Sequence, residues 1–208
     1  MKHRVWQILL CMLTALFQLE AALQPIPSAT VHIPMRDGVE LTADLYYPYE
    51  SIITNEYPCI LLRLPAGRKA EMWLHLAHLA QQGYVVAVQD TRSALDPEGK
   101  TLPYVSDGWE TQQDGLDTVN WLASSSFTNG KVGTAGFSAA GFTQLMMAPT
   151  APPALKCQYV GQAGGSLYHH AIFPGGQMQK NQVETWLGHY APHPSVFEWV
   201  SLPPPPPS

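Results

Sequence analysis

Hydrophobic and polar residues alternate in two short runs near the start of the chain, TVHIP and VELTADLY, with the pair Asp37-Gly38 between them. Strict alternation is typical of strands with one buried face, and an Asp-Gly pair between two such runs is a strong signal for a tight turn. The pattern therefore predicts an antiparallel hairpin, with strands near residues 30–35 and 39–47.

Four continuous apolar runs follow the hairpin, and helical patterns lie between them. A short apolar run is typical of a strand buried on both faces of a parallel sheet. Apolar residues three and four positions apart predict amphipathic helices between these strands. Strand and helix in alternation predict an α/β fold, in which a mostly parallel sheet carries helices on both faces and an antiparallel N-terminal hairpin. The predicted strands cover 57–65, 84–92, 131–136 and 155–164, and the predicted helices run from Trp73 to Gly83, over 109–124 and over 139–148.

The periodic pattern fades after Gly165. Residues 166–202 contain aromatic residues, glycines and histidines without a clear period, and residues 203–208 are five prolines and a serine. A run of prolines is compatible only with an extended polyproline conformation. Two interpretations of this tail stay open: a ligand for proline-binding modules, or a truncated or aberrant terminus.

The first 22 residues have the pattern of a secretory signal peptide. Lys2, His3 and Arg4 precede the apolar run VWQILLCMLTALFQL, and small residues follow at Ala21 and Ala22. A basic start, an apolar middle and small residues near the cleavage point define such signals. We therefore expect a secreted protein with no stable membrane span after signal removal. The alternatives are an uncleaved N-terminus that anchors the protein to a membrane, or a start assigned too far upstream.

Composition narrows the function classes. The chain has 208 residues, 46% hydrophobic and 13% charged, which predicts one globular domain with a substantial core. A net charge of −5 offers no basic surface for nucleic acid. No cofactor-binding motif and no metal-ligand set is recognisable. His75 and His78 share a helix face without a third ligand, so a solvated pair is the interpretation we adopt.

Two cysteines remain once the signal peptide is removed. Cys59 and Cys157 both lie in apolar runs predicted to be strands. An oxidising compartment permits a disulfide bond between them, but two cysteines do not make a disulfide framework. We expect both to be buried free thiols.

Ser138 is the residue with the clearest chemical signal. It lies in the segment GFSAAG, after a predicted buried strand and before a predicted helix, with Gly136, Ala140 and Gly141 around it. A nucleophile elbow needs this context, because the turn is so sharp that larger neighbours would collide. In an elbow, the N–H of Ala139 points toward a developing oxyanion. The alternative is a serine that merely caps a helix.

The order of motifs resembles the cocaine esterase and Xaa-Pro dipeptidyl-peptidase group of serine hydrolases. The segments that carry the resemblance are MRDGVELTADLYYP, GYVVAVQDTR, DGWETQQDGLDTVNWLASSSFTNGKVGTAGFSAAGFTQ and PPALKCQYVGQAGGSLY, and together they cover roughly residues 31–168. The resemblance implies the α/β-hydrolase fold, with the family's nucleophile on Ser138 and its backbone oxyanion donor on Ala139. The substrate it implies is a small ester or peptide.

The chain also departs from the pattern of that group. The family usually supplies a second oxyanion donor from a tyrosine that follows a proline, and this chain has Ala66 after Pro65. In α/β-hydrolases the catalytic acid and histidine follow the serine, well downstream. We expect both to be missing from this chain, the sheet to be incomplete at the C-terminus, and the chain alone to be inactive.

Several local residues are weaker candidates for the missing roles. His169 and His170 follow the fourth buried strand, and solvated loop histidines are the favoured interpretation of both. Paired carboxylates at Asp114 and Asp117 fit a solvated helix face or a local brace better than acid–base chemistry. A structural ion pair at Asp90 and Arg92 is favoured over a substrate contact. Four further candidates have no predicted element: His189, His193, Glu184 and Glu198.

The sequence therefore predicts a signal peptide over 1–22, a partial α/β-hydrolase domain over 30–168, an irregular segment or the start of a cap over 169–202, and a proline tail over 203–208. The expected function is hydrolysis of an ester or peptide bond through an acyl-enzyme on Ser138. The alternative is a non-catalytic secreted binding protein or pseudoenzyme of the same fold.

Overall fold

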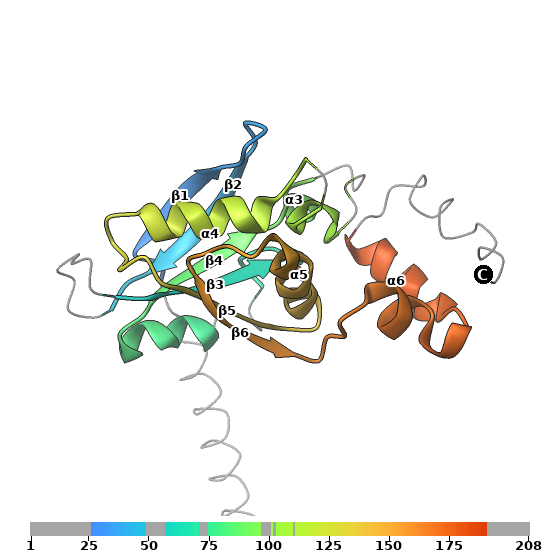
Figure 1. Ribbon diagram of the computed structural model, residues 1–208. Helices are drawn as coiled ribbons and strands as arrows, with labels where there is room; N and C mark the ends of the chain where they lie inside the picture. The colour runs from blue at the N-terminus through green and yellow to red at the C-terminus, as the bar shows by residue number, and fades with distance from the viewer. Residues whose placement is uncertain are drawn as a thin grey trace, which may run out of the picture.

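A computed structural model describes residues 26–48, 57–70, 75–96, 101, 103–109 and 111–190. Its centre is a six-stranded sheet in the order β1-β2-β4-β3-β5-β6 (Figure 1). The predicted hairpin is present, because β1 and β2 are antiparallel neighbours and Gly38 lies in the turn between them with a φ of 85°. The strands are β1 (Ala29–Pro34), β2 (Glu40–Tyr46), β3 (Cys59–Leu64), β4 (Val85–Asp90), β5 (Val132–Phe137) and β6 (Leu155–Gly161).

The sheet is mixed, as the sequence predicts. β4 lies antiparallel to β2, whereas β3, β4, β5 and β6 are joined by parallel pairings. The four apolar runs therefore form the parallel part and the alternating runs form the antiparallel edge. β6 is the last strand on the other edge among the described residues. Helices connect the strands: η1 (His75–Gln82), α3 (Arg92–Leu95), η2 (Val105–Asp107), α4 (Asp114–Ser124), α5 (Ala139–Met147) and η3 (Ala148–Thr150).

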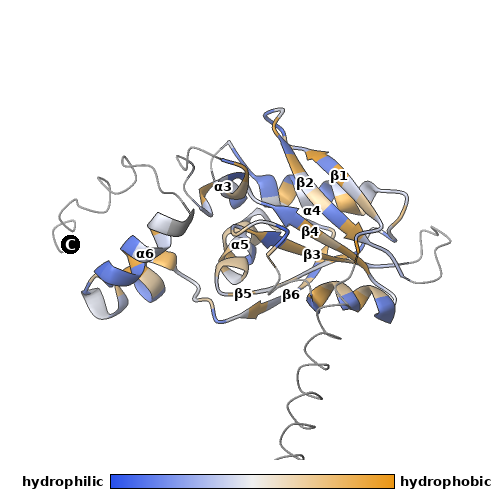
Figure 2. Ribbon diagram, turned by 180° about the vertical axis from the view of Figure 1, so that it is seen from behind, coloured by the Kyte–Doolittle hydropathy of each residue, from blue (hydrophilic) through white to orange (hydrophobic). Residues whose placement is uncertain are grey.

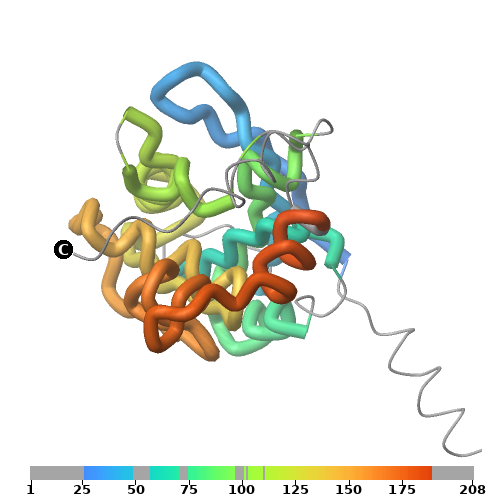
Figure 3. The backbone as a smooth tube through the Cα atoms, turned by 90° about the vertical axis from the view of Figure 1, so that its right-hand side faces the viewer, coloured from blue at the N-terminus to red at the C-terminus, as the bar shows by residue number. Residues whose placement is uncertain are grey.

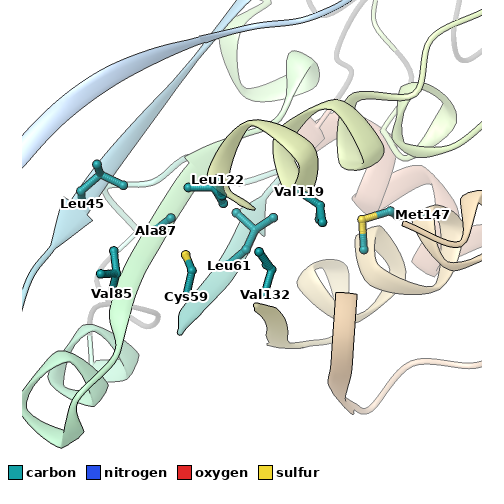
Figure 4. Packing of buried hydrophobic residues seen from close by; sticks show 9 residues of the cluster. All are labelled: Leu45, Cys59, Leu61, Val85, Ala87, Val119, Leu122, Val132 and Met147. Carbon is teal, nitrogen blue, oxygen red and sulfur yellow. The ribbon is translucent and has the colours of Figure 1, made fainter. Parts of the chain in front are cut away.

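Two apolar layers bury the central strands. Successive residues of β3 and β4 point to opposite faces of the sheet, so each strand contributes to both layers. On one face, Leu61 packs with Val119 and Leu122 of α4 (Figure 4). On the other face, Leu62 packs with Ala77 of η1. Because both faces are covered, these strands are continuous apolar runs. The helix α6 (Lys180–Tyr190), by contrast, has mixed hydropathy (Figure 2).

The helices differ from the predicted ones in three respects. The helix expected from Trp73 is a 3-10 helix that begins at His75 in the described residues, and Trp73 lies outside them. α4 begins at Asp114 rather than near residue 109, because Trp109 forms an isolated bridge with Gln112 ahead of it. The short helix α3 was not predicted, and it lies in a polar segment without periodicity.

The segment after β6 is more ordered than its sequence pattern predicts. It forms η4 (Tyr168–Ile172), η5 (Pro174–Gly176) and α6 (Lys180–Tyr190), which lie beyond the end of the sheet on the side of α5 (Figures 1 and 3). α6 was missed because it is mostly exposed: only Val183 is buried among its described side chains. A helix that buries so little carries almost no apolar period.

No helix of the described part of the chain has the length and apolar character needed to cross a membrane. The proposed signal peptide and the proline tail both lie outside the described residues.

Candidate functional site

Ser138 lies at a sharp turn between β5 and α5. Its φ of 51° and ψ of −119° are unusual for a residue other than glycine, and such a conformation costs about 1–3 kcal/mol. Its side chain makes no capping hydrogen bond to the helix, and the residue is exposed. The interpretation of Ser138 as only a helix cap therefore has no support in the hydrogen bonding. The turn presents the hydroxyl to solvent at the carboxyl end of a central strand.

The turn closes only because its neighbours are small. A Cβ atom added to Gly136 would lie 2.6 Å from the Cβ of Ala140, and one added to Gly141 would lie 2.7 Å from the Cβ of Ala163. Distances this short do not occur between real side chains. The small residues that the sequence places around Ser138 are thus required by the close approach of β5, α5 and the segment after β6.

Backbone hydrogen bonds hold Ser138 in this conformation. Its N–H donates to the carbonyl oxygen of Gly161 at 2.9 Å, and its own carbonyl oxygen accepts from the N–H groups of Gly141 at 2.9 Å and Phe142 at 3.0 Å. Ala139 is the first residue of α5, so its N–H belongs to the first turn, whose N–H groups have no partner within the helix. N–H groups at the start of a helix favour negative charge nearby.

An aromatic cluster covers the start of α5. The rings of Tyr104, Phe142 and Trp186 contact one another, with ring centroids 5.7–6.1 Å apart. Ala139 is buried in the same cluster. Trp186 comes from α6, so the segment without sequence periodicity packs directly against the elbow. The sequence signal for this contact is weak, because a single tryptophan on a polar helix is its only mark.

A buried ion pair lies at the end of β3. The guanidinium of Arg63 pairs with the carboxylate of Asp107, and both side chains are almost fully buried. Arg63 Nε also donates to Gln89 Oε1 at 2.8 Å, and Gln89 Nε2 donates to Thr118 Oγ1 at 2.9 Å. Burial raises the pKa of Asp107 to about 6, although Arg63 acts in the opposite direction. The sequence signal for this network was a lone arginine within the apolar run CILLRLP.

Asp90 and Arg92 both form structural ion pairs, although with other partners than each other. Asp90 pairs with Arg68, and Arg92 pairs with both Asp114 and Asp37. The hydrogen bond from Arg92 lowers the pKa of Asp37 to about 2. The predicted ion pair is therefore correct in kind and wrong in its pairing, because helix α3 turns Arg92 toward α4.

The paired carboxylates of α4 form structural ion pairs. Asp114 is fully buried against Arg92, so it is not part of a solvated face. Asp117 binds Arg36 in the hairpin, with Arg36 Nη2 2.7 Å from Asp117 Oδ1. Burial acts to raise the pKa of Asp117, but the hydrogen bonds from Arg36 outweigh it and the pKa lies below its usual value. Both carboxylates thus tie α4 to neighbouring segments and are not poised for acid–base chemistry.

The loop after β3 contains Ala66, where the family resemblance implies a tyrosine. Ala66 is exposed, and the loop around it is fixed by the backbone N–H of Arg68, which donates to Asp90 Oδ1 at 2.6 Å. Arg68 and Lys69 also reach the buried carboxylate of Asp44. The loop is thus held rigidly, while the side chain at position 66 offers no hydroxyl donor.

The described candidate partners of Ser138 make their contacts with other residues. His170 Nδ1 accepts a hydrogen bond from the backbone N–H of Ser166 at 3.1 Å, and the ring of His169 packs against Tyr168. Both histidines are exposed, and Glu184 forms an exposed pair with Lys180. Within the described residues, no histidine or carboxylate is hydrogen-bonded to the Ser138 hydroxyl. His193, Glu198 and the side chain of His189 lie outside the described residues.

The cysteines are free, as expected, but only one is buried. Cys59 lies in the core, where burial raises the pKa of its thiol to about 12. The prediction that Cys157 is buried is wrong, because β6 lies at the sheet edge and this side chain is exposed. His75 and His78 are both exposed, and the described residues contain no group of three or more metal-ligating side chains.

The family model described as X-Pro dipeptidyl-peptidase (S15 family) matches residues 37–195 of the chain. The chain belongs to this family. Cocaine esterase from Rhodococcus sp. (strain MB1 Bresler) is 32% identical over 170 residues, which make up 77% of this chain and 27% of that protein. The S15 chain therefore spans about a quarter of the length of this curated relative.

A solved structure gives the same fold. A CocE/NonD family hydrolase from Staphylococcus aureus superimposes with a TM-score of 0.62 at 20% identity, over 83% of this chain and 35% of that chain. An alpha-amino acid ester hydrolase is 32% identical, with a TM-score of 0.47, over 62% of this chain and 24% of its own. The S15 chain thus has the mixed, mostly parallel sheet of the α/β-hydrolase fold.

Proposed function

We propose that this chain is the nucleophile-bearing part of a serine hydrolase that cleaves ester or peptide bonds through an acyl-enzyme on Ser138. The observation that carries the proposal is the strained, exposed turn at Ser138, between a buried parallel strand and a helix. Membership of the S15 family supports the same reaction class.

The proposed reaction has two halves, an acylation and a hydrolysis. Ser138 Oγ attacks the carbonyl carbon of the substrate, and its proton passes to a general base. The N–H of Ala139 donates to the oxyanion that forms. The bond to the leaving group then breaks, and the departing alcohol or amine takes up the proton. Water attacks the acyl-enzyme in the second half of the reaction, which releases a carboxylic acid and regenerates the serine.

The base and acid of the triad come, in this proposal, from outside the described residues. Without its base, a serine hydroxyl is a poor nucleophile at neutral pH, and loss of the histidine from a serine triad costs on the order of 10⁶ in turnover. We therefore propose that residues 1–208 alone are inactive and that the full-length natural protein containing them is active. The substrate class stays at the level of small esters or peptides.

Covalent labelling tests this proposal. The full-length natural protein is treated with a fluorophosphonate probe, and the modified peptide is identified by mass spectrometry. We expect labelling at Ser138 and its complete loss in Ser138→Ala, with Ser106→Ala as a control for loss of a serine hydroxyl elsewhere. A folded wild-type protein that the probe leaves unlabelled contradicts the proposal.

Two observations favour a second function. Ala66 stands where the family resemblance implies a tyrosine donor, and the described contacts of His169 and His170 are with Tyr168 and Ser166 rather than with Ser138. A non-catalytic secreted form of the same fold would have both features. The sequence of the full-length protein distinguishes the two functions. An Asp and a His that follow Ser138 at hydrolase spacing, together with probe labelling, support the enzyme. Their absence supports the inert form.

The assignment of the N-terminal segment is also a proposal. We propose that residues 1–22 are a cleaved signal peptide and that the protein is secreted, because basic, apolar and small residues follow in the required order. N-terminal sequencing of the protein recovered from culture medium tests this. A mature N-terminus near residue 23 is expected, and a membrane-bound protein that retains residues 1–22 would contradict it.

A further inference from the structure

Gln144 is a buried polar residue directly behind the serine turn. It lies on α5, six residues after Ser138, and only 3% of its surface is exposed. Burying a carboxamide is costly unless each of its polar atoms finds a partner. The partners of Gln144 therefore indicate what the residue does.

The carboxamide of Gln144 joins three segments around the turn. Its Oε1 accepts from Thr134 Oγ1 of β5 at 2.7 Å. Its Nε2 lies within hydrogen-bond distance of the carbonyl oxygens of Gly136 at 3.3 Å, Ala140 at 3.0 Å and Tyr159 at 3.2 Å. Those carbonyls belong to β5, α5 and β6. One side chain thus connects the strand before Ser138, the helix after it and the neighbouring strand.

The main chain of Gln144 takes part in the same connection. Its carbonyl oxygen accepts from Gln158 Nε2 of β6 at 2.9 Å. α5 is therefore bound to β6 from both the side chain and the backbone of this residue. The spacing between these two elements matters, because β6 also supplies the Gly161 carbonyl that holds the N–H of Ser138.

A strained backbone persists only where its surroundings determine it fully. The φ of 51° at Ser138 is a conformation that residues other than glycine rarely adopt, and a side chain at Gly136 would collide with Ala140 across the turn. The Gln144 carboxamide binds the carbonyl of Gly136 on one side of the turn and that of Ala140 on the other. It is the side chain that spans the strained residue.

We propose that Gln144 is a positioning residue of the reaction. It fixes β5, β6 and the first turn of α5 relative to one another, and so sets the position of the Ser138 hydroxyl and of the Ala139 N–H. This inference rests on the proposed function of Ser138. Its effect is on the rate of the chemical step, since misplacing a reacting group by about 1 Å costs up to roughly 10²-fold.

The test compares two buried glutamines in the full-length natural protein. Gln144→Met removes the carboxamide and keeps the length of the side chain. Gln89→Met is the matched control, because Gln89 is equally buried and hydrogen-bonded but contacts Arg63 and Thr118 rather than the turn. For both variants, the melting temperature is measured together with kinact and KI of the fluorophosphonate, well below the melting temperature.

Positioning predicts a separation of rate from binding and from stability. We expect Gln144→Met to lower kinact roughly 10- to 100-fold with KI within about twofold of the wild type. Gln89→Met should lower the melting temperature and leave kinact within about twofold of the wild type. Equal kinact in wild type and Gln144→Met, or equal losses in both variants, overturns the inference while the proposed function stands. Absence of Ser138 labelling in the wild type overturns both.

A gentler variant covers the case in which Gln144→Met does not fold. Thr134→Val removes only the hydroxyl that binds Oε1 and keeps the shape of the β5 side chain. It frees the carboxamide to rotate, so kinact should fall about two- to tenfold with KI unchanged. An unchanged kinact in a folded Thr134→Val protein contradicts the proposed role.

Discussion

The two halves of the parallel part of the sheet are built differently. The half formed by β3 and β4 is buried on both faces, and buried ion pairs fix the loops at its carboxyl end. The half formed by β5 and β6 carries the strained serine turn, and its outer strand exposes Cys157 and 63% of Tyr159. We therefore expect the first half to contribute more to the free energy of unfolding, whereas the second half holds an unfavourable backbone conformation beside solvent.

The largest effect is expected in the first half, from breaking its buried ion pair. Asp107→Ala leaves the guanidinium of Arg63 buried without its counter-charge, which costs about 3–5 kcal/mol. Urea unfolding of the variant measures the loss. The double variant Arg63→Met with Asp107→Leu removes both charges and should recover most of it. A loss below that of an exposed substitution would show that the pair is not buried in solution.

Removing packing from the same half should cost nearly as much. Leu61→Ala deletes a fully buried side chain between β3 and α4, and we expect a loss of about 2–5 kcal/mol in the free energy of unfolding. The same urea titration measures it. A neutral Leu61→Ala would contradict the larger contribution of the first half to the free energy of unfolding.

A substitution in the loop after β3 would test whether the first half contributes to the chemistry as well. Ala66→Tyr restores the hydroxyl that the family resemblance implies as the second oxyanion donor. Since removal of one such donor costs about 10²–10³ in turnover, we expect a gain of at least about tenfold in kcat of the full-length natural protein. Ala66→Phe is the control, because it adds the ring without the donor and should give no gain.

The pH dependence of stability distinguishes buried from exposed carboxylates. The folded-state pKa of Asp107 is about 6, above its ordinary value, so its contribution is present at low pH and is lost as the pH rises through about 6. Asp37 is opposite: its pKa is lowered to about 2, so its contribution is lost as the pH falls below about 4 toward 2. In urea titrations, Asp107→Asn should flatten the change in the free energy of unfolding between pH 4 and about 6. The fall in this free energy below about pH 4 should remain. Its absence in that variant would contradict the assignment.

The smallest effect is expected at the exposed edge. Tyr159→Ser changes a side chain that is mostly in water, and we expect a change of no more than about 0.5 kcal/mol in the free energy of unfolding. A loss comparable to that of Leu61→Ala would mean that this edge is covered in solution. The comparison of the two halves would then need revision.

The sequence predicted the elements from β1 to β6 better than the segment after β6. Continuous apolar runs and an Asp-Gly turn carry strong local signals, so the strands and their mixed arrangement were predictable. α6 was not, because it buries Val183 and packs through Trp186 without a repeating apolar face. Its position depends on the contact with Phe142, which lies far away in the sequence.

The candidate site also has features that the sequence predicted and features that it did not. The elbow was predictable because small residues around Ser138 are a local requirement of its geometry. The true partners of Asp90 and Arg92 were not, since they depend on how a loop and a short helix turn in space. Gln144 was missed because a glutamine on a helix has no pattern until its three acceptor carbonyls are in place.

The two cysteines of the sheet differ in how easily a thiol reagent reaches them. Cys157 is exposed, whereas the Cys59 thiol is enclosed in the core at the start of β3, where burial keeps it protonated. A thiol reagent added to the native protein should therefore modify one at once and reach the other only when strands separate. The lag between the two events records how often the interior opens.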